Sequence, residues 1–254
     1  QIDQIVRACP KERRQTLLFS ATMTNQVDKL AKLALHKPVW LAVDRKYDMT
    51  QTLTHELVRL QGEDDSGKWD EDSKMLEEIR GAALLVVCTS LVQSRALIFC
   101  TTKIDAHRVM LILSLAGLKA ADLHGDQTHA QRMEALSKFK NQEVDFLVST
   151  DLAARGLDID GVKAVINYKL PLTLVRYVHR VGRTARAGKI GRAISLACDR
   201  DTELLSEVVK HTQGKVVRRT LEPTELEKWH GKVTEMKDDL EEVLQAEEQD
   251  KETI

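Results

Sequence analysis

The feature that most constrains the fold is an alternation of short apolar runs with helix-period segments between Ala96 and Gly214. Each apolar run is short enough for a strand and is followed by a helical pattern, which is typical of βαβ units in a parallel sheet. The sequence therefore predicts an α/β fold whose parallel sheet is flanked by helices. The expected strands are Ala96 to Cys100, Ala120 to His124, Phe146 to Ser149, Ala164 to Tyr168 and Arg192 to Ala197.

Two helices are expected between these strands. Residues 104–116 space apolar side chains at helical period, and Gly117 supplies a stop signal. The segment from Thr128 to Phe139 has the same pattern, with Met133, Leu136 and Phe139 on one side.

The first part of the chain resembles the end of a separate α/β unit. Two expected strands, Gln15 to Phe19 and Val39 to Val43, flank an expected helix from Gln26 to Leu35. We place a boundary within residues 44–50, so that residues 1–44 end one domain and residues 45–219 form a second. Residues 220–254 are expected to form an acidic helical extension. The strongly acidic segment 62–72 reads as a solvated loop.

The extension carries one apolar helix face. Thr224 and Glu227 have the spacing of a capping box, and apolar residues then recur at intervals of 3, 4, 3, 4 and 3. This face could pack against its own domain or bind a partner, and Gly231 interrupts it; the sequence leaves both interpretations open. The apolar residues are Leu226, Trp229, Val233, Met236, Leu240 and Val243.

Composition excludes several classes of protein. With 254 residues, 43% apolar and 30% charged, the chain is neither disordered nor fibrous. Its four cysteines have no CxxC spacing, so we expect reduced thiols in an intracellular protein, and no metal site. No apolar stretch approaches the roughly 18 residues that span a bilayer, so a membrane partner is not expected. Because the first residue is Gln1, the chain is expected to be part of a longer protein.

Local charge is more informative than the overall charge of −1. Residues 100–192 contain 15 Lys or Arg and 9 Asp or Glu, a local charge of +6 that could face phosphates. Residues 220–254 contain 12 acidic and 4 basic residues, a charge of −8 that would repel a nucleic-acid backbone.

A cluster of basic residues runs from His179 to Gly188. Arg180, Arg183 and Arg186 are three residues apart, so on one helix they would project in the same general direction. Neighbouring guanidinium groups repel each other unless an anion lies among them. A guanidinium can bind phosphate oxygens in a fork and can stabilise charge on a transferring phosphoryl group.

Polar and small residues follow the expected strands at one edge of the sheet. In parallel sheets ligands bind at the carboxyl ends of the strands. Asp158 could accept a hydrogen bond from a ribose hydroxyl, while Thr150 and Arg155 could contact a phosphate chain. The small Gly156 allows close backbone approach.

Two further strand ends extend the same edge. Thr101 and Thr102 follow one strand, His124 and Gly125 follow another, and Arg132 lies in the next helix. Hydroxyls, backbone amides and arginines without an aromatic platform hold a sugar-phosphate chain and do not read its bases. The expected binding is salt-dependent and largely independent of sequence.

Taken together, these motifs resemble the C-terminal half of a DEAD-box RNA helicase of superfamily two, which has a RecA-like fold. Ser20-Ala21-Thr22 is similar to the motif that couples ATP hydrolysis to strand separation. Four ordered motifs over about 170 residues carry the resemblance. Beside Ser20 to Thr22, they are Leu97 to Thr102, Thr150 to Asp158 and His179 to Gly188.

The resemblance implies roles for individual residues. Arg183 and Arg186 are similar to the arginine fingers that contact the ATP γ-phosphate, with His179 as a catalytic and interdomain residue. Gly156 and Asp158 are similar to the nucleotide-binding positions. The implied RNA contacts are Thr101, Thr102, Gly125, Arg132, Thr150 and Arg155; the implied interdomain coupling residues are Ser20, Ala21, Thr22, His179 and Arg180.

The implied function is an ATP-dependent RNA helicase in which Mg²⁺ is held mainly by a first domain, since no phosphate-binding loop or Asp-Glu-Ala-Asp box occurs in this sequence. Residues 232–244 resemble the tail of nucleolar members of the family that act in large ribosomal subunit assembly. Pre-ribosomal RNA, proteins of the pre-ribosomal particle and a nuclear, nucleolar location are implied. The alternatives are a non-catalytic scaffold that binds RNA or protein in ribosome assembly and, with less support, a DNA-directed helicase.

Overall fold

The computed structural model divides the chain into two compact units, Gln1–Asp48 and Met49–Ile254. The acidic segment 62–72 and the boundary expected within 44–50 lie outside the described residues. The structure describes residues 2–10, 14–20, 25–41, 52–60, 74–154 and 159–252.

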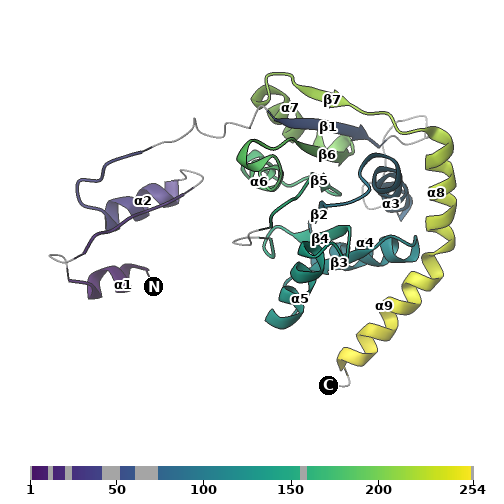
Figure 1. Cartoon of the computed structure of the whole chain (residues 1–254), viewed down its shortest axis with the longest axis horizontal. Coiled ribbons are helices and arrows are strands. Elements are labelled where there is room, and N and C mark those ends of the chain that lie inside the picture. The colour runs from purple at the N-terminus through teal and green to yellow at the C-terminus, as the bar shows by residue number, and fades with distance from the viewer. Residues whose placement is uncertain are drawn as a thin grey trace. The chain divides into compact units, whose positions relative to one another are not determined.

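The first unit contains helices α1 (Ile2–Ala8) and α2 (Asn25–Ala34) (Figure 1). The helix expected at 26–35 is confirmed by α2. The strand expected at Gln15–Phe19 is wrong, because residues 14–20 have no regular structure and Phe19 is 87% exposed. Residues 39–41 of the second expected strand are also irregular. A strand needs neighbouring backbone groups to pair with, and the described part of this unit contains no sheet to provide them.

The second unit is built on one parallel sheet with the strand order β3-β4-β2-β5-β6-β1-β7. Short strands rich in Val, Ile, Leu and Ala are buried on both sides, as parallel sheets require. The strands are β1 (Leu53–Arg59), β2 (Ala96–Cys100), β3 (Ala120–Leu123), β4 (Phe146–Thr150), β5 (Ala164–Asn167), β6 (Gly191–Ala197) and β7 (Val216–Arg218).

Helices cover both faces of this sheet (Figure 1). They are α3 (Lys74–Val86), which continues as a π-helix over Val87–Leu91, α4 (Lys103–Leu115), α5 (His129–Lys140), α6 (Leu174–Val181), α7 (Thr202–His211), α8 (Pro223–Glu235) and α9 (Lys237–Glu252). Short 3-10 helices lie at Arg186–Gly188 and Asp199–Asp201.

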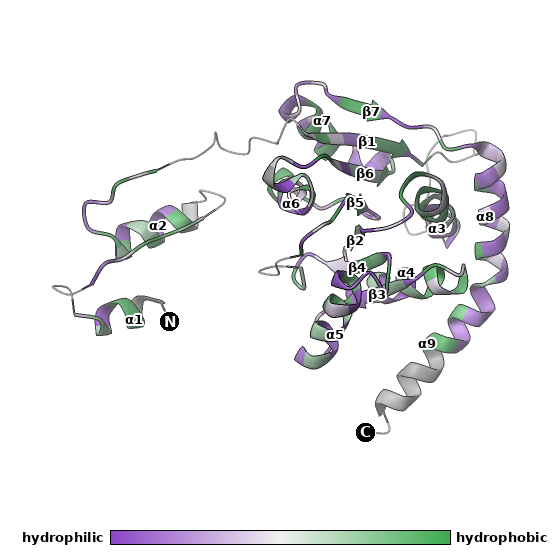
Figure 2. Ribbon diagram, viewed as in Figure 1, coloured by the Kyte–Doolittle hydropathy of each residue, from purple (hydrophilic) through white to green (hydrophobic). Residues whose placement is uncertain are grey.

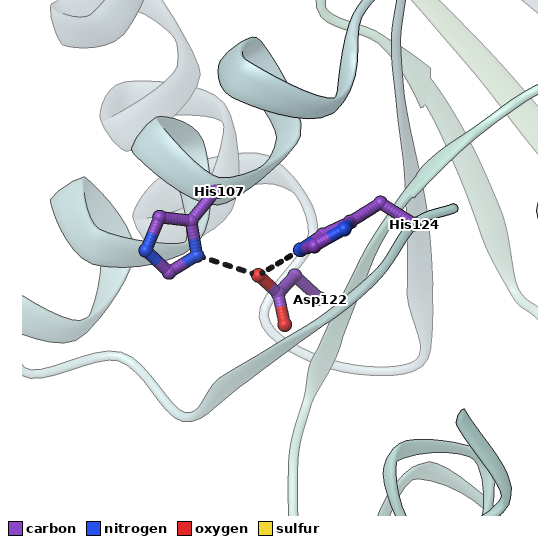
Figure 3. A group of neighbouring side chains, drawn as sticks. All are labelled: His107, Asp122 and His124. Atoms are coloured by element: carbon purple, nitrogen blue, oxygen red, sulfur yellow. Dashed lines mark hydrogen bonds and ion pairs between the residues drawn. The ribbon is translucent and has the colours of Figure 1, made fainter. Parts of the chain in front are cut away.

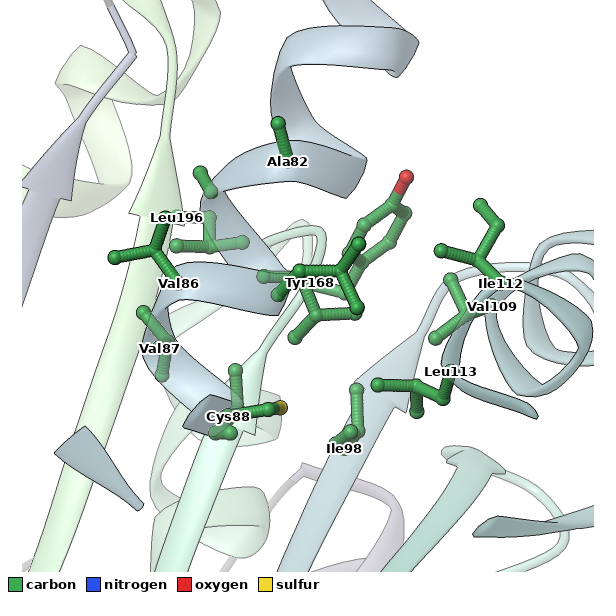
Figure 4. Close-up of a cluster of buried hydrophobic side chains, with 14 of the residues drawn as sticks. Ala82, Val86, Val87, Cys88, Ile98, Val109, Ile112, Leu113, Tyr168 and Leu196 are labelled. Atoms are coloured by element: carbon green, nitrogen blue, oxygen red, sulfur yellow. The ribbon is translucent and has the colours of Figure 1, made fainter. Parts of the chain in front are cut away.

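Alternate strand residues point to opposite faces and so enter different cores. Ile98 of β2 packs with α3 and α4 beside Tyr168 (Figure 4), whereas its neighbours Leu97 and Phe99 pack with α5. A third cluster joins α6 and α7 to β1 and β6. The α/β fold and the five expected strands are confirmed, with ends that differ by at most one residue.

The C-terminal extension packs against its own unit, so the first of its two open interpretations is confirmed. Trp229, Val233 and Leu240 are buried in the same core as α3, and Val233 lies against Gly81 of that helix. In Figure 2 the ribbon of α3 is largely hydrophobic while α8 is mostly hydrophilic with hydrophobic bands.

Two details of the extension differ from expectation. The capping box at Thr224 is wrong, because the N-cap of α8 is Glu222, two residues earlier, and the helix begins at Pro223. Proline at this position is pre-organised for a helix start. Gly231 does not interrupt α8, and the helical run instead breaks at Met236, between α8 and α9.

Among the described helices, none combines the length and the apolar character needed to cross a membrane.

Candidate functional site

The carboxyl ends of four strands meet at one edge of the sheet. The register pairs Cys100 with Thr150 and Leu123 with Ser149, and it pairs Phe99 with Asn167. The loops that follow β2, β3, β4 and β5 therefore begin side by side. We call this edge the strand-end edge. It brings together Thr101, Thr102, Gly125 and Thr150, as the strand pattern predicts.

The loops after β2 and β3 are tied to each other through α4. Thr102 is the N-cap of α4, and its hydroxyl oxygen accepts a hydrogen bond from the Asp105 backbone N–H at 3.0 Å. The next residue, Lys103, forms an ion pair with Asp126 at 2.6 Å. Thr101, Thr102 and Gly125 are all exposed. The N-cap thus holds the Thr102 hydroxyl at the surface, and the ion pair holds the loop that contains Gly125 next to it.

Arg132 of α5 reaches the loop that follows β4. Its Nη2 atom donates to the carbonyl of Ala153 at 3.1 Å, and its side chain is half-buried. Thr150 is buried at the end of β4, where its carbonyl accepts from the Ala154 N–H at 3.1 Å. A positive charge therefore lies against a tight turn at the strand-end edge, in a position to contact an anion.

Arg180 is the most deeply buried charged residue near this edge. Its side chain is 1% exposed, and its Nε and Nη2 atoms donate to the two carboxylate oxygens of Asp151 at 2.6 Å and 2.9 Å. Further bonds reach the Asn167 amide oxygen at 3.2 Å and the Lys169 carbonyl at 2.7 Å. The guanidinium also lies over the Phe99 ring, 5.1 Å from its centre. These contacts fix α6 to the ends of β2, β4 and β5.

The expectation that three arginines share one helix face is wrong. Helix α6 ends at Val181 with Gly182 as its C-cap, so Arg183 lies in a turn and Arg186 begins a 3-10 helix. The Arg180 guanidinium is engaged by the buried contacts described above, whereas Arg183 is half-buried and Arg186 is exposed. The spacing of three is helical, but the glycine ends the helix before the face can form.

The turn after α6, which we call the arginine turn (residues 182–188), is held in place by residues at the start of β5 and β6. Thr184 is buried and its hydroxyl donates to the Val162 carbonyl at 2.7 Å. A Cβ at Gly191 would lie 2.6 Å from the Ala185 nitrogen, so only glycine lets β6 approach this turn. Arg186 Nε donates to the Gly182 carbonyl at 2.8 Å, which orients an otherwise exposed guanidinium.

Other predicted residues lie in varied places. His179 is half-buried on α6, and Ser20 is exposed in the first unit. Five predicted residues lie outside the part of the chain that the structure describes: Ala21, Thr22, Arg155, Gly156 and Asp158.

Sequence reasoning missed the partners that hold the site together. Asp151 follows β4 and Asn167 ends β5, but nothing in the sequence pairs them with an arginine 29 and 13 residues away. A second group, His107, Asp122 and His124, comes together from α4, β3 and the residue after β3. Its members are too scattered to show a metal-ligand spacing.

Comparisons with known proteins bear on this arrangement. Residues 77–188 match the helicase conserved C-terminal domain. The chain is 45% identical over 247 residues to "DEAD-box ATP-dependent RNA helicase 28" of Arabidopsis thaliana, covering 97% of this chain and 30% of that protein. It is 42% identical over 254 residues to "ATP-dependent RNA helicase drs1" of Aspergillus fumigatus, covering 99% and 29%.

A solved DEAD-box structure has a similar fold. Dbp5 of S. cerevisiae, bound to RNA and ADP BeF3, superposes with a TM-score of 0.69 at 26% identity, covering 91% of this chain and 58% of that one. The chain belongs to the DEAD-box RNA helicases. Its second unit has the RecA-like fold of DEAD-box C-terminal domains. The chain spans about 30% of the length of the two DEAD-box relatives above.

Proposed function

We propose that this chain is the C-terminal half of an ATP-dependent RNA helicase that remodels RNA during large ribosomal subunit assembly. In this proposal residues 1–44 end the first RecA-like domain, residues 45–219 form the second, and residues 220–254 are a family-specific extension. Family membership supports the helicase part. The observation that carries the catalytic part is the arginine turn, in which Arg186 is exposed, its Nε donates to the Gly182 carbonyl, and Thr184 ties the turn to Val162.

The arginine turn fits the γ-phosphate of ATP. ATP, when bound, supplies a phosphoryl group whose transfer to water spreads negative charge over its oxygens. Arg183 and Arg186 would neutralise that charge from this side, while Gly156 and Asp158 would hold the nucleotide. His179 would contact the first RecA-like domain of the longer protein. Ser20, Ala21 and Thr22 belong to that domain and would take part in the coupling between the two domains.

We assign Arg180 a supporting part in this proposal. Its guanidinium is bound to Asp151, so it would couple the domains by holding α6 in place. The same contact engages the Asp151 carboxylate, which is therefore a poor ligand for Mg²⁺. We propose that Mg²⁺ is held mainly by the first RecA-like domain.

The strand-end edge fits an RNA backbone. Thr101, Thr102 and Thr150 would donate to phosphate oxygens, Gly125 would let the chain approach closely, and Arg132 and Arg155 would add positive charge. Such contacts read no bases, so the proposed affinity depends on salt and little on sequence. Dbp5, whose structure contains RNA, superposes over 91% of this chain and supports this assignment.

The ribosomal part of the proposal rests on the extension. Residues 232–244 resemble the tail of nucleolar helicases, and the match to the fungal drs1 helicase runs through them. Pre-ribosomal RNA is the proposed substrate, proteins of the pre-ribosomal particle could meet the acidic surface of the extension, and the proposed location is the nucleolus. Crosslinking the protein to RNA in cells tests this: contacts concentrated in pre-ribosomal RNA support it, and contacts spread evenly over messenger RNA contradict it.

The catalytic proposal is tested with Arg186→Ala in the full-length protein. An arginine finger contributes about 10³ to 10⁵ in rate, so RNA-stimulated ATP hydrolysis should fall at least 10³-fold while the far-UV circular dichroism spectrum is unchanged. Lys189→Ala removes an exposed cation three residues away and serves as the control, with an expected change below about twofold. Normal hydrolysis by Arg186→Ala contradicts the assignment.

A further inference from the structure

Three side chains that the proposed function does not use converge beside the strand-end edge (Figure 3). Asp122 Oδ2 lies 2.8 Å from His107 Nδ1 and 3.3 Å from His124 Nε2. One potential ligand atom from each of the three residues lies within 4.8 Å of the other two. They come from α4, β3 and the residue after β3, so the fold assembles the group from separate elements.

The group is enclosed but reachable by a small ion. The three side chains are 20%, 13% and 15% exposed for His107, Asp122 and His124. Burial alone would raise the pKa of Asp122, but hydrogen bonds from both imidazoles outweigh it and hold that pKa well below its usual range. An aspartate carboxylate is charged at neutral pH and accepts only, which is the form that binds a cation.

A glutamine fixes the carboxylate from behind. Gln127 Nε2 donates to Asp122 Oδ1 at 2.8 Å and to the Asp122 carbonyl at 3.2 Å. Its Oε1 accepts from the His124 backbone N–H at 3.2 Å. Outer contacts of this kind orient metal ligands in proteins and leave little to reorganise on binding.

The donor set selects a particular class of ion. Two imidazole nitrogens and one carboxylate oxygen suit zinc and similar first-row divalent metals, whereas Ca²⁺ and Mg²⁺ prefer all-oxygen sites. Zinc binds these donors at about 2.0–2.2 Å, so in a tetrahedral site they lie about 3.4 Å apart. The observed separations from Asp122 Oδ2 to the two nitrogens are 2.8 Å and 3.3 Å, so small side-chain rotations suffice.

We propose that His107 Nδ1, Asp122 Oδ2 and His124 Nε2 bind one divalent metal ion of the zinc class, with water in the remaining position. Each imidazole binds the ion in its neutral form, through the nitrogen that faces Asp122, and carries its single proton on the other nitrogen. A hydrogen that lay between ring and carboxylate moves to that other nitrogen through solvent. In His124 that nitrogen, Nδ1, is buried without a hydrogen-bond partner in the described structure. A missing outer contact costs about 10- to 100-fold in affinity, so we expect a micromolar Kd.

The first test is a titration of the metal-stripped chain with Co²⁺ in a buffer free of phosphate and imidazole. We expect saturable 1:1 binding below about 100 μM, visible absorption bands of a nitrogen–oxygen site, and displacement by Zn²⁺ but not by an equal amount of Mg²⁺. The absence of saturable binding up to about 1 mM overturns the proposal.

Variants then locate the ion. His107→Ala and His124→Ala should each weaken Co²⁺ binding at least 10-fold, as expected when a ligand is lost. His129→Ala removes an exposed imidazole at the start of α5 and should bind Co²⁺ like the parent chain. Unchanged binding by both ligand variants overturns the proposal.

A measurement on the unmodified chain decides the case if the variants fail to fold. In proton NMR spectra, Zn²⁺ should shift the ring signals of His107 and His124 and leave those of His129 in place. A shift confined to His129 or to other histidines contradicts the site.

Discussion

Arg180 and Asp151 show how one buried ion pair holds the loops of this domain in place. The arginine is 1% exposed and the carboxylate 26%, and two short hydrogen bonds join them. Such a pair contributes little over a well-packed apolar pair, yet removing one partner leaves a buried charge without compensation. The pair therefore affects the free energy of unfolding mainly because breaking it leaves one buried charge without a partner.

We predict that Asp151→Asn lowers the free energy of unfolding by about 3 kcal/mol. The exposed pair Arg59–Asp199, with side chains 65% and 41% exposed, is the matched control, and Arg59→Ala should cost less than about 1 kcal/mol. Urea unfolding of both variants measures the difference. Equal costs for the two changes would show that the buried pair has no special role.

A buried histidine predicts how stability depends on pH. His55 is 3% exposed, and its Nδ1 lies 2.9 Å from the Tyr177 hydroxyl. Burial, with a smaller contribution from the charge of His211, lowers the pKa of His55 to about 4 from 6.5. Protons therefore bind the unfolded chain more tightly than the folded one across this interval.

The stability contributed by neutral His55 is fully present above pH 6.5 and is lost as pH falls toward about 4. By linkage, the loss reaches about 3 kcal/mol at the lower end. We predict that His55→Gln removes most of this pH dependence, whereas His129→Gln, at an exposed position, keeps it. Urea titrations between pH 7 and pH 4.5 measure it; a parallel pH profile for parent and His55→Gln would refute the prediction.

Among helices and strands, apolar periodicity predicts the elements whose burial follows a regular pattern. It misses elements in which that pattern is interrupted or in which every residue is buried. Strands β2 to β6 follow their apolar runs, but β1 was not expected because His55 and Glu56 interrupt its pattern. Glu56 is buried, and Arg192 and Arg219 satisfy it at 2.6 Å and 2.7 Å. Those partners lie 136 and 163 residues away, so no local signal can reveal that the acid is compatible with a central strand.

Helix α3 was missed for the opposite reason. Its second half, Ala82 to Val86, is buried on all sides, so it has no polar face and no helical period. The candidate site, too, can be predicted only in part. Strand order predicts that Thr102, Gly125 and Thr150 share an edge, whereas the fate of Arg180 depends on where α6 ends and on Asp151 being within reach.

The docking of the extension gives a prediction at this scale. Trp229 and Val233 of α8 are buried against α3, and Val243 of α9 is 37% exposed. We predict that Trp229→Ala lowers the free energy of unfolding by about 3–5 kcal/mol, because it removes a large side chain from a core. Val243→Ala should cost under about 0.5 kcal/mol. A Trp229→Ala cost no larger than that of the control would mean that the extension is loosely attached.

Across the whole second unit, two surfaces of different chemistry are built on one sheet. The strand-end edge collects hydroxyls, a glycine loop and Arg132, while the arginine turn lies beyond the other end of α6, next to Val162 and Gly191, where β5 and β6 begin. Buried Arg180 joins α6 to the strand-end edge and so connects the two surfaces mechanically. The described RNA contacts that we propose, and Arg183 and Arg186, thus lie on one sheet and its connected elements.

This division predicts how RNA affinity responds to salt in the full-length protein. Each phosphate neutralised on a single strand contributes about 0.7 to the slope of log affinity against log salt concentration. Arg132→Gln at the strand-end edge should therefore reduce that slope by about 0.7 for every RNA sequence tested. Lys163→Gln removes an exposed cation just before β5, at the opposite edge, and should leave the slope unchanged. Fluorescence anisotropy with two unrelated single strands between 50 and 200 mM salt, the range over which phosphate contacts dominate, measures it. A sequence-specific loss, or equal effects of the two variants, would place the RNA elsewhere.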